Sequence, residues 1–213
     1  HGVDKRASSG AVWRGDLPVP RPGPGEALVE VLAAGVNATD INTRIGWYGS
    51  DEAAGWAGAL EFPRIQGSDL CGRVVALGDG VTRLDLGARV ICPTNQAEPS
   101  PGNPRAFVAI GSEYDGAFAR YARVPARHLH DVSASPLRDV ELGAMPCAFG
   151  TAINLLARAG VTAGEAVLVT GASGGVGLAA VQLAHLHGAT VTGQTSADKA
   201  AVVRNAGAMV LDR

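Results

Sequence analysis

A glycine-rich stretch over residues 172–177 has the residue types and the spacing to bind phosphate. It follows an apolar run, Ala166–Val169, that predicts a buried strand, and it leads into an apolar segment that predicts a helix over 176–186. A strand, a glycine turn and a helix in this order let the backbone approach a pyrophosphate and aim the first N–H groups of the helix at it. The sequence therefore predicts a dinucleotide site, whose expected residues are Ala172, Ser173, Gly174, Gly175, Val176 and Gly177. The alternative is a tight strand-to-helix turn that binds no ligand.

The next predicted strand, over 190–194, indicates which dinucleotide this is. It ends without the carboxylate that commonly holds the ribose 2′-hydroxyl of NAD, and Gln194 and Thr195 stand there instead. Thr195 and Ser196 can donate hydrogen bonds to a 2′-phosphate, and Lys199 adds a positive charge in the first turn of the following helix. These residues favour NADP(H) as the cofactor. Capping of that helix by Thr195 or Ser196 is the alternative, and it is compatible with phosphate binding.

The elements that must position these residues differ between the two parts of the chain. Up to about residue 132, short β-like runs over 27–32, 72–77 and 88–92 are separated by turns rich in glycine and proline, a pattern typical of an irregular β-barrel. From about residue 137, strands and helices alternate, as in a parallel α/β sheet. We expect a first domain over 1–136, a second over 137–213, and a surface loop over 94–104.

Composition limits the partners that the chain can have. The 213 residues are 46% hydrophobic and carry a net charge of −2, so nothing predicts binding to nucleic acid or to an anionic membrane. No apolar run approaches the length of a membrane span. Cys71, Cys92 and Cys147 are odd in number and widely spaced, which favours free thiols and a cytoplasmic location. A small-molecule substrate is the expected partner.

Motifs along nearly the whole chain resemble the medium-chain dehydrogenase/reductase superfamily, and within it the zinc-independent, zeta-crystallin-like quinone oxidoreductases. The resemblance rests on residues 22–26, 34–40, 72–75, 87–90, 116–121, 150–152 and 172–177. It implies a GroES-like irregular β-barrel followed by a Rossmann α/β domain, with the active site in the cleft between them and a homodimer in the full-length protein. Compared with that family both ends look cut, so we expect a fragment or a protein with further residues.

The resemblance also places the catalytic-zinc ligands of related alcohol dehydrogenases on this chain. The matching positions are Asn37, Ser68 and Cys147, with Asp69 where some relatives have a glutamate. Catalytic zinc needs about three protein ligands, and asparagine and serine are poor ones. The four-cysteine lobe that holds a structural zinc is reduced to Cys92. We therefore expect no bound metal and interpret Cys147 as a small apolar residue.

Without a Lewis acid, alcohol oxidation is difficult, whereas conjugate reduction of a quinone or an α,β-unsaturated carbonyl needs only a hydride and a hydrogen-bond donor. The resemblance puts Asn37 in the cleft and Thr151 beside the nicotinamide as candidate catalytic residues, with Trp47 and Tyr48 lining the substrate pocket. The alternatives are a turn-stabilising Asn37, a helix-capping Thr151 and ordinary turn aromatics. Two other functions stay open: an NADP-binding protein with little or no turnover, and a zinc-type alcohol dehydrogenase.

Two local pairings complete the expectations. His128 and His130 are predicted to share one face of a strand without binding metal, because no further ligand is close in sequence. Asp40 is expected to make a structural hydrogen bond or an ion pair with Arg44, one turn further along a helix.

Overall fold

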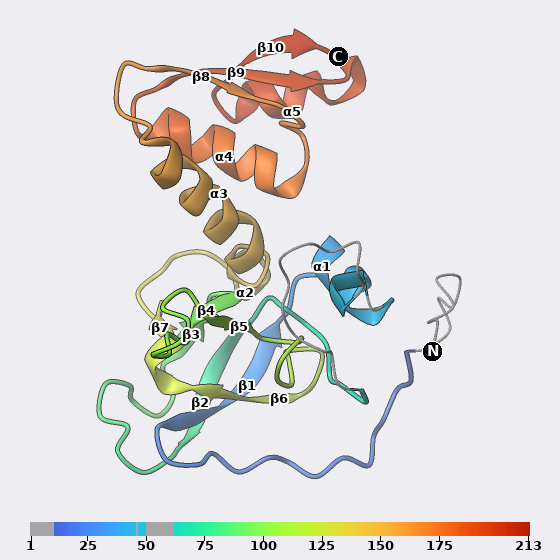
Figure 1. Ribbon diagram of the computed structural model, residues 1–213, viewed down its shortest axis with the longest axis vertical. Coiled ribbons are helices and arrows are strands. Elements are labelled where there is room, and N and C mark those ends of the chain that lie inside the picture. Colours follow the sequence, from blue (N-terminus) through green and yellow to red (C-terminus); the bar gives the residue numbers. More distant parts are fainter. Residues whose placement is uncertain (1–10, 46, 50–61) are drawn as a thin grey trace. The chain divides into compact units, whose positions relative to one another are not determined.

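A computed structural model describes residues 11–45, 47–49 and 62–213 of the chain. The chain divides into two compact units, His1–Pro146 and Cys147–Arg213, which Figure 1 colours blue to yellow and yellow-brown to red. The expected boundary after residue 136 lies too early, because α2 (Asp139–Leu142) packs against β1 and β2 of the first unit. The expected lack of an initial strand concerns residues 1–10, which lie outside the described residues.

The first unit is built around an antiparallel sheet of five strands in the order β6-β1-β2-β3-β7. The strands are β1 (Glu26–Ala33), β2 (Cys71–Leu77), β3 (Arg89–Ile91), β6 (Tyr121–Pro125) and β7 (His130–Asp131). All three strands predicted in this region are confirmed, and their inward-facing residues form one apolar core. The pairing of β1 with β2 is irregular at two places, as suits a sheet that bends toward closure.

The polar stretch after β3 is not the open loop that its composition predicts. β4 (Asn95–Ala97) pairs with β5 (Phe107–Ala109), so the expectation of a loop is wrong at the start of this segment. The strand forms because Gln96 turns inward, where its Nε2 donates to the Tyr114 hydroxyl at 2.6 Å and to the Cys92 sulfur at 3.0 Å. A buried glutamine with partners satisfies strand packing without the apolar pattern that marks a strand in sequence.

Three glycines bring distant backbone segments of the first unit into direct contact. Gly67 and Gly111 have positive φ values of 111° and 81°. A Cβ on Gly111 would lie 2.8 Å from the Gly67 backbone, and one on Gly116 would overlap the Gly67 carbonyl oxygen. The Ala117 N–H donates to that same oxygen at 3.0 Å. We call Gly67, Gly111 and Gly116 the glycine node; it fixes the backbone that carries Ser68.

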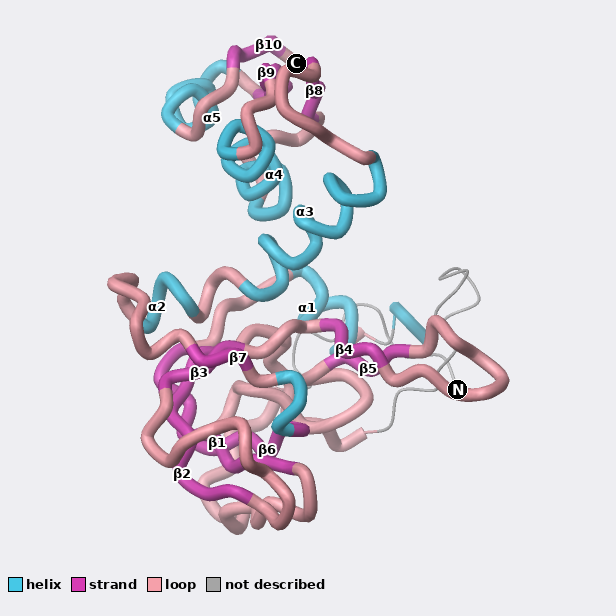
Figure 2. Tube along the Cα trace, turned by 90° about the vertical axis from the view of Figure 1, so that its left-hand side faces the viewer, coloured by secondary structure: helices cyan, strands magenta, loops and turns pink. Residues whose placement is uncertain are grey.

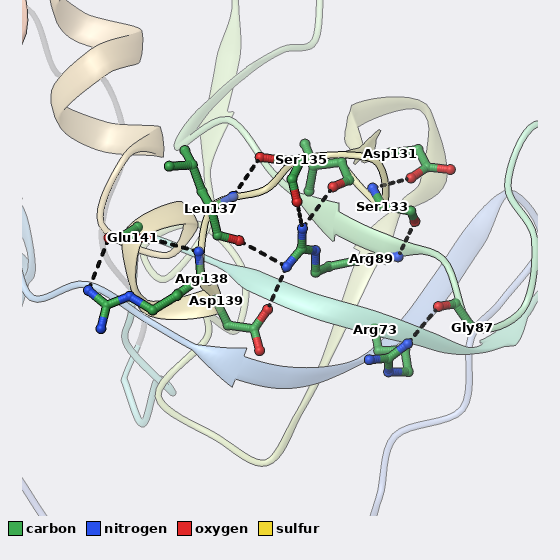
Figure 3. A network of polar contacts seen from close by, with 11 residues as sticks. Arg73, Gly87, Arg89, Asp131, Ser133, Ser135, Leu137, Arg138, Asp139 and Glu141 are labelled. Carbon is green, nitrogen blue, oxygen red and sulfur yellow. Dashed lines mark hydrogen bonds and ion pairs between the residues drawn. The ribbon is translucent and has the colours of Figure 1, made fainter.

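The segment that leads from the first unit toward the second is held by one arginine (Figure 3). The Arg89 guanidinium donates to the carbonyl oxygens of Val132, at 3.2 Å, Ser135, and Leu137, at 3.1 Å. It also pairs with the Asp139 carboxylate at 3.2 Å, in the first turn of α2. Four bonds from one planar group tie residues 132–139 to β3. We call this arrangement the Arg89 clamp.

The second unit alternates helices and strands as predicted. It contains α3 (Pro146–Ala159), β8 (Ala166–Val169), α4 (Gly175–Leu186), β9 (Thr190–Thr195), the short helix η3 (Ala197–Lys199), α5 (Ala200–Asn205) and β10 (Met209–Asp212). The three strands are parallel in the order β10-β9-β8, and α4 and α5 lie on one side of them (Figures 1 and 2). On β8 the predicted burial holds only in part, because Leu168 is 60% exposed. Among the described residues, no helix is long and apolar enough to cross a membrane.

Candidate functional site

The glycine turn of the second unit forms an open helix N-terminus. Gly171 takes the left-handed conformation with a φ of 62°, and the Gly174 N–H donates to its carbonyl oxygen at 3.0 Å. The Ala172 N–H donates to the Gln194 carbonyl oxygen at 3.1 Å, which ties the turn to β9. Gly174 is the N-cap of α4 and has no side chain to occupy the first N–H groups of the helix. Those groups are therefore available to an external acceptor.

The space around the glycines separates two roles. A Cβ on Gly177 would overlap the Gly171 carbonyl oxygen and lie 2.9 Å from the Ala172 Cα, so this glycine is required by packing. A Cβ on Gly174 would be 3.4 Å from its nearest neighbour, and one on Gly175 would be 3.8 Å away. Packing does not require glycine at these two positions. Their missing side chains leave room for a ligand that approaches the backbone closely.

The end of β9 holds the residues predicted to select NADP(H). Thr195 is 3% exposed, and its Oγ1 has no hydrogen-bond partner among the described residues. Ser196 is half-buried and Lys199 is exposed. Sequence reasoning overlooked Asp198: the Ser196 hydroxyl beside it holds the pKa of its carboxyl below the usual range, and Lys199 acts in the same direction. A carboxylate thus engages both residues that are expected to meet a 2′-phosphate.

Asn37 stands at the beginning of α1 (Ala38–Arg44) as its N-cap. Its Nδ2 donates to the Asp69 Oδ2 at 2.8 Å, although the two residues are far apart in sequence. Asp69 is 1% exposed, whereas Asn37 is half-buried and reaches solvent. The turn-stabilising alternative for Asn37 is therefore incomplete, because the side chain binds a buried carboxylate as well as standing at a helix start.

The buried Asp40 carboxylate joins the two segments that carry this pair. Its Oδ2 accepts from the Asn37 N–H at 2.7 Å, and its Oδ1 accepts from the Ser68 N–H at 3.0 Å. The structural hydrogen bond expected for Asp40 is confirmed with these partners rather than with Arg44. The Ser68 hydroxyl is buried and has no partner among the described residues.

The two predicted pocket aromatics lie beside the same helix. They form the short helix η1 (Trp47–Gly49), and their rings meet edge to face with centroids 5.1 Å apart. The Tyr48 hydroxyl donates to the Thr39 Oγ1 at 2.9 Å, which brings it to the first turn of α1. Trp47 is 40% exposed. The first unit thus gathers Asn37, Tyr48 and Trp47 around α1.

Thr151 lies inside α3, which begins at Pro146, so the alternative that it caps a helix is wrong. The error arose because Gly150 was interpreted as a break, whereas the structure accommodates it within the helix. Thr151 is exposed, and it belongs to the second unit together with the glycine turn. The structure brings the predicted cofactor residues together within that unit, and the predicted substrate residues together within the first.

The residues at the expected zinc positions do not fit this metal. Zinc in proteins is bound mainly by thiolate, imidazole and carboxylate groups. Asn37 presents an N–H to Asp69, and Ser68 presents a hydroxyl, so two of the matched positions carry neither thiolate nor imidazole. Across the described ranges, no cluster of three or more His, Cys, Asp or Glu residues is placed to hold a metal ion.

Other titratable groups play structural parts. His128 ends the short helix η2 (Ala126–His128) and contacts Glu98 at 3.2 Å, while His130 lies on β7, so the prediction that they share a strand face is wrong. All three cysteines are free thiols. A polar depression of about 360 Å³ is lined by Arg73, Gly87, Arg89, Ser133 and Asp139.

Comparison with known proteins places these features in a family context. Residues 23–134 match the family of alcohol dehydrogenase GroES-like domains, which confirms the predicted barrel. An acryloyl-coenzyme A reductase of Metallosphaera sedula is 33% identical over 195 residues, which cover 86% of this chain and 55% of that protein. The chain thus spans little more than half the length of this curated relative.

Solved structures agree with the two-unit fold. A putative alcohol dehydrogenase from Sinorhizobium meliloti has a TM-score of 0.85 and 40% identity, over 95% of this chain and 58% of the other. A mycobacterial protein solved with NADPH has a TM-score of 0.72 and 31% identity, over 92% of this chain and 53% of the other. These likenesses confirm the GroES-like barrel followed by a Rossmann-type parallel sheet.

Proposed function

This chain belongs to the medium-chain dehydrogenase/reductase superfamily, and we propose that its protein is an NADPH-dependent, zinc-independent reductase of the quinone oxidoreductase branch. The substrate would be a quinone or an α,β-unsaturated carbonyl compound. One observation carries the proposal: Asn37 and Ser68 stand where zinc-dependent relatives have ligands, and Asn37 is engaged as a hydrogen-bond donor to Asp69. The likeness to an acryloyl-coenzyme A reductase supports the same substrate class, since an acryloyl group is a conjugated carbonyl.

The residues of the second unit fit a dinucleotide. The first N–H groups of α4 would bind the pyrophosphate, the open positions Gly174 and Gly175 would admit it, and Thr151 would contact the nicotinamide end. Bound NADPH would supply the hydride. Ala172, Ser173, Val176 and Gly177 complete the turn that shapes the binding site.

Preference for NADPH is proposed from the end of β9. No carboxylate stands at Gln194 or Thr195, and Ser196 and Lys199 can reach a 2′-phosphate from the adjoining turn. The nearby Asp198 opposes this charge, so the preference depends on how far the carboxylate turns away. The mycobacterial neighbour with bound NADPH is consistent with this choice.

The chemistry asked of the first unit is modest. When hydride adds to the β-carbon of an enone, negative charge develops on the carbonyl oxygen, and a positioned N–H donor stabilises it. Asn37 supplies such a donor, and Trp47 and Tyr48 offer apolar surface beside it. A metal is not required for this step, because conjugation delivers the charge to an oxygen that hydrogen bonds can hold.

Two other functions compete with this one. A cofactor-binding protein without turnover would share every residue named here. A zinc-type alcohol dehydrogenase is favoured by the name of the Sinorhizobium neighbour, but the donor atoms at Asn37 and Ser68 oppose it. We further propose a cytoplasmic homodimer that acts on a small molecule and binds neither nucleic acid nor membrane, in keeping with the net charge of −2.

The test measures NADPH and NADH oxidation by the intact protein against a panel of quinones, enones and saturated aldehydes. We expect turnover with conjugated substrates, little with saturated aldehydes, and no loss of activity after dialysis against a zinc chelator. Asp198→Asn should strengthen NADPH binding and leave NADH binding nearly unchanged. Chelator-sensitive activity on alcohols would replace the proposal with the zinc-type alternative, and tight NADPH binding without turnover would leave the cofactor-binding one.

A further inference from the structure

We propose that Asp69 is a positioning residue: it holds the Asn37 amide in the one orientation in which an N–H of that amide can donate to the substrate oxygen. This inference rests on the proposed function and adds a residue to it. The juxtaposition was not foreseen from the sequence, where Asp69 drew attention only as a candidate metal ligand.

The orientation follows from the chemistry of the two side chains. A carboxylate accepts hydrogen bonds and an amide has one accepting and one donating end, so only the NH₂ end of Asn37 can face Asp69 favourably. The Asn37 Nδ2 lies 2.8 Å from the Asp69 Oδ2. One hydrogen of the NH₂ group is used in this bond. The other belongs to a half-buried residue whose side chain makes no further hydrogen bond within the described part of the chain.

The backbone around the pair is fixed independently of it. Asp40 accepts the N–H of Asn37 at 2.7 Å and the N–H of Ser68 at 3.0 Å, so it holds both segments. Gly35 packs so closely that a Cβ there would lie 2.5 Å from the Asp69 Oδ2. Asp69 has little room to move, and at 1% exposure little water competes for it. Asp40 thus sets the backbones, and Asp69 sets the amide.

The energetic reason is pre-organisation. A hydrogen bond to a charged acceptor is roughly twice as strong as a neutral one, so the amide is strongly biased against turning over. A donor held in place before the reaction costs nothing to reorient when charge develops on the substrate. Removing a single donor of this type lowers kcat by about 10²–10³-fold in well-studied enzymes. Loosening the donor without removing it should have a smaller effect, of about tenfold.

A double-mutant cycle on kcat tests whether Asp69 acts through Asn37. Asp69→Asn keeps the shape but lets the amide face either way, and we expect kcat to fall about tenfold with the KM for NADPH unchanged. Asn37→Ala should lower kcat about 10²-fold. In the Asn37→Ala background, Asp69→Asn should have no further effect on kcat. Asp85→Asn, the same change at an exposed position of the same unit, is the matched control and should leave kcat as in the wild type.

The reversed pair, Asn37→Asp combined with Asp69→Asn, separates positioning from structure. It restores a charge-assisted bond between the two side chains, so the melting temperature should recover most of what Asn37→Asp alone loses. It leaves no N–H at position 37, so kcat should stay low. Recovery of both would show that the pair is only structural and would overturn the inference.

Two further outcomes keep the inference and the proposed function distinguishable. If the wild type reduces conjugated substrates but Asp69→Asn lowers kcat equally with and without Asn37, Asp69 does not act through the amide and the inference alone falls. If the intact wild type reduces none of the panel, the proposed function falls and takes the inference with it.

Discussion

Replacing Arg89 by methionine should destabilise the protein more than any other single change of a charged residue in the first unit. The methionine keeps much of the length of the side chain and removes the guanidinium, so the Arg89 clamp is lost without a large cavity. Residues 132–139 would then have only their remaining contacts to hold them to β3, and the Asp139 carboxylate would lose its ion pair.

The size of the effect can be worked from the contacts. A net hydrogen bond from a charged group contributes about 1.5–3 kcal/mol, but four bonds that break together are not additive, and the freed carbonyl groups can reach water. The Arg89 side chain is 18% exposed and Asp139 is 41% exposed, so the ion pair is only partly shielded. We therefore expect a loss of about 3 kcal/mol, near the lower end for breaking a buried pair. In a protein of this size that lowers the melting temperature by roughly 6–12 °C.

Thermal and urea unfolding of the intact protein measure this loss. Arg73→Met is the matched control, because Arg73 pairs with Arg89 across β2 and β3 but is exposed and donates only to the Gly87 carbonyl among the described residues. Its removal should change stability by less than about 0.5 kcal/mol. Arg89→Lys should lie between, since lysine keeps the charge but not the planar fork. A loss below about 1 kcal/mol for Arg89→Met would refute the idea that the clamp holds this segment.

Three other predictions concern cofactor and thiols. Lys199→Ala should weaken NADPH binding by roughly ten- to a hundredfold and leave NADH binding nearly unchanged, which titration of the intact protein by fluorescence measures; equal weakening of both would contradict it. Gly174→Ala should fold normally yet bind NADPH poorly, whereas Gly177→Ala should lower the melting temperature as well, because its Cβ would overlap the glycine turn. Burial raises the pKa of Cys71 to about 11 and that of Cys92 to about 12, so both stay protonated at pH 8. Mass spectrometry should find these two thiols unlabelled by alkylating reagents in the native protein and labelled after denaturation.

Local sequence patterns predicted most of the fold because the elements concerned are stabilised by their own residues. The strand, glycine turn and helix over 166–186 combine apolar runs with glycine at positions that packing or open space explains. The short strand β4 was missed because its inward residue, Gln96, is polar and is satisfied by partners distant in sequence. The domain boundary was placed early because α2 packs on strands whose proximity no local pattern reveals.

The candidate site divides in the same way. The glycine turn could be found from spacing alone, because a phosphate-binding backbone demands particular residues in sequence order. The link between Asn37 and Asp69 could not, since it joins residues 32 positions apart and depends on how β2 and α1 are brought together. Asp198 was visible in the sequence but was passed over, because attention fell on the strand end where the carboxylate of NAD-binding relatives stands.

The glycine node also decides how this protein can be diversified. A methyl group at Gly67, Gly111 or Gly116 would force apart the backbones that carry Ser68 and Asp69. In a random library screened for new substrates, clones altered there would disappear as misfolded protein and would say nothing about specificity. Trp47, which is 40% exposed, has no such constraint from packing. A focused library should therefore vary the aromatic side chains beside α1 and keep the three glycines constant.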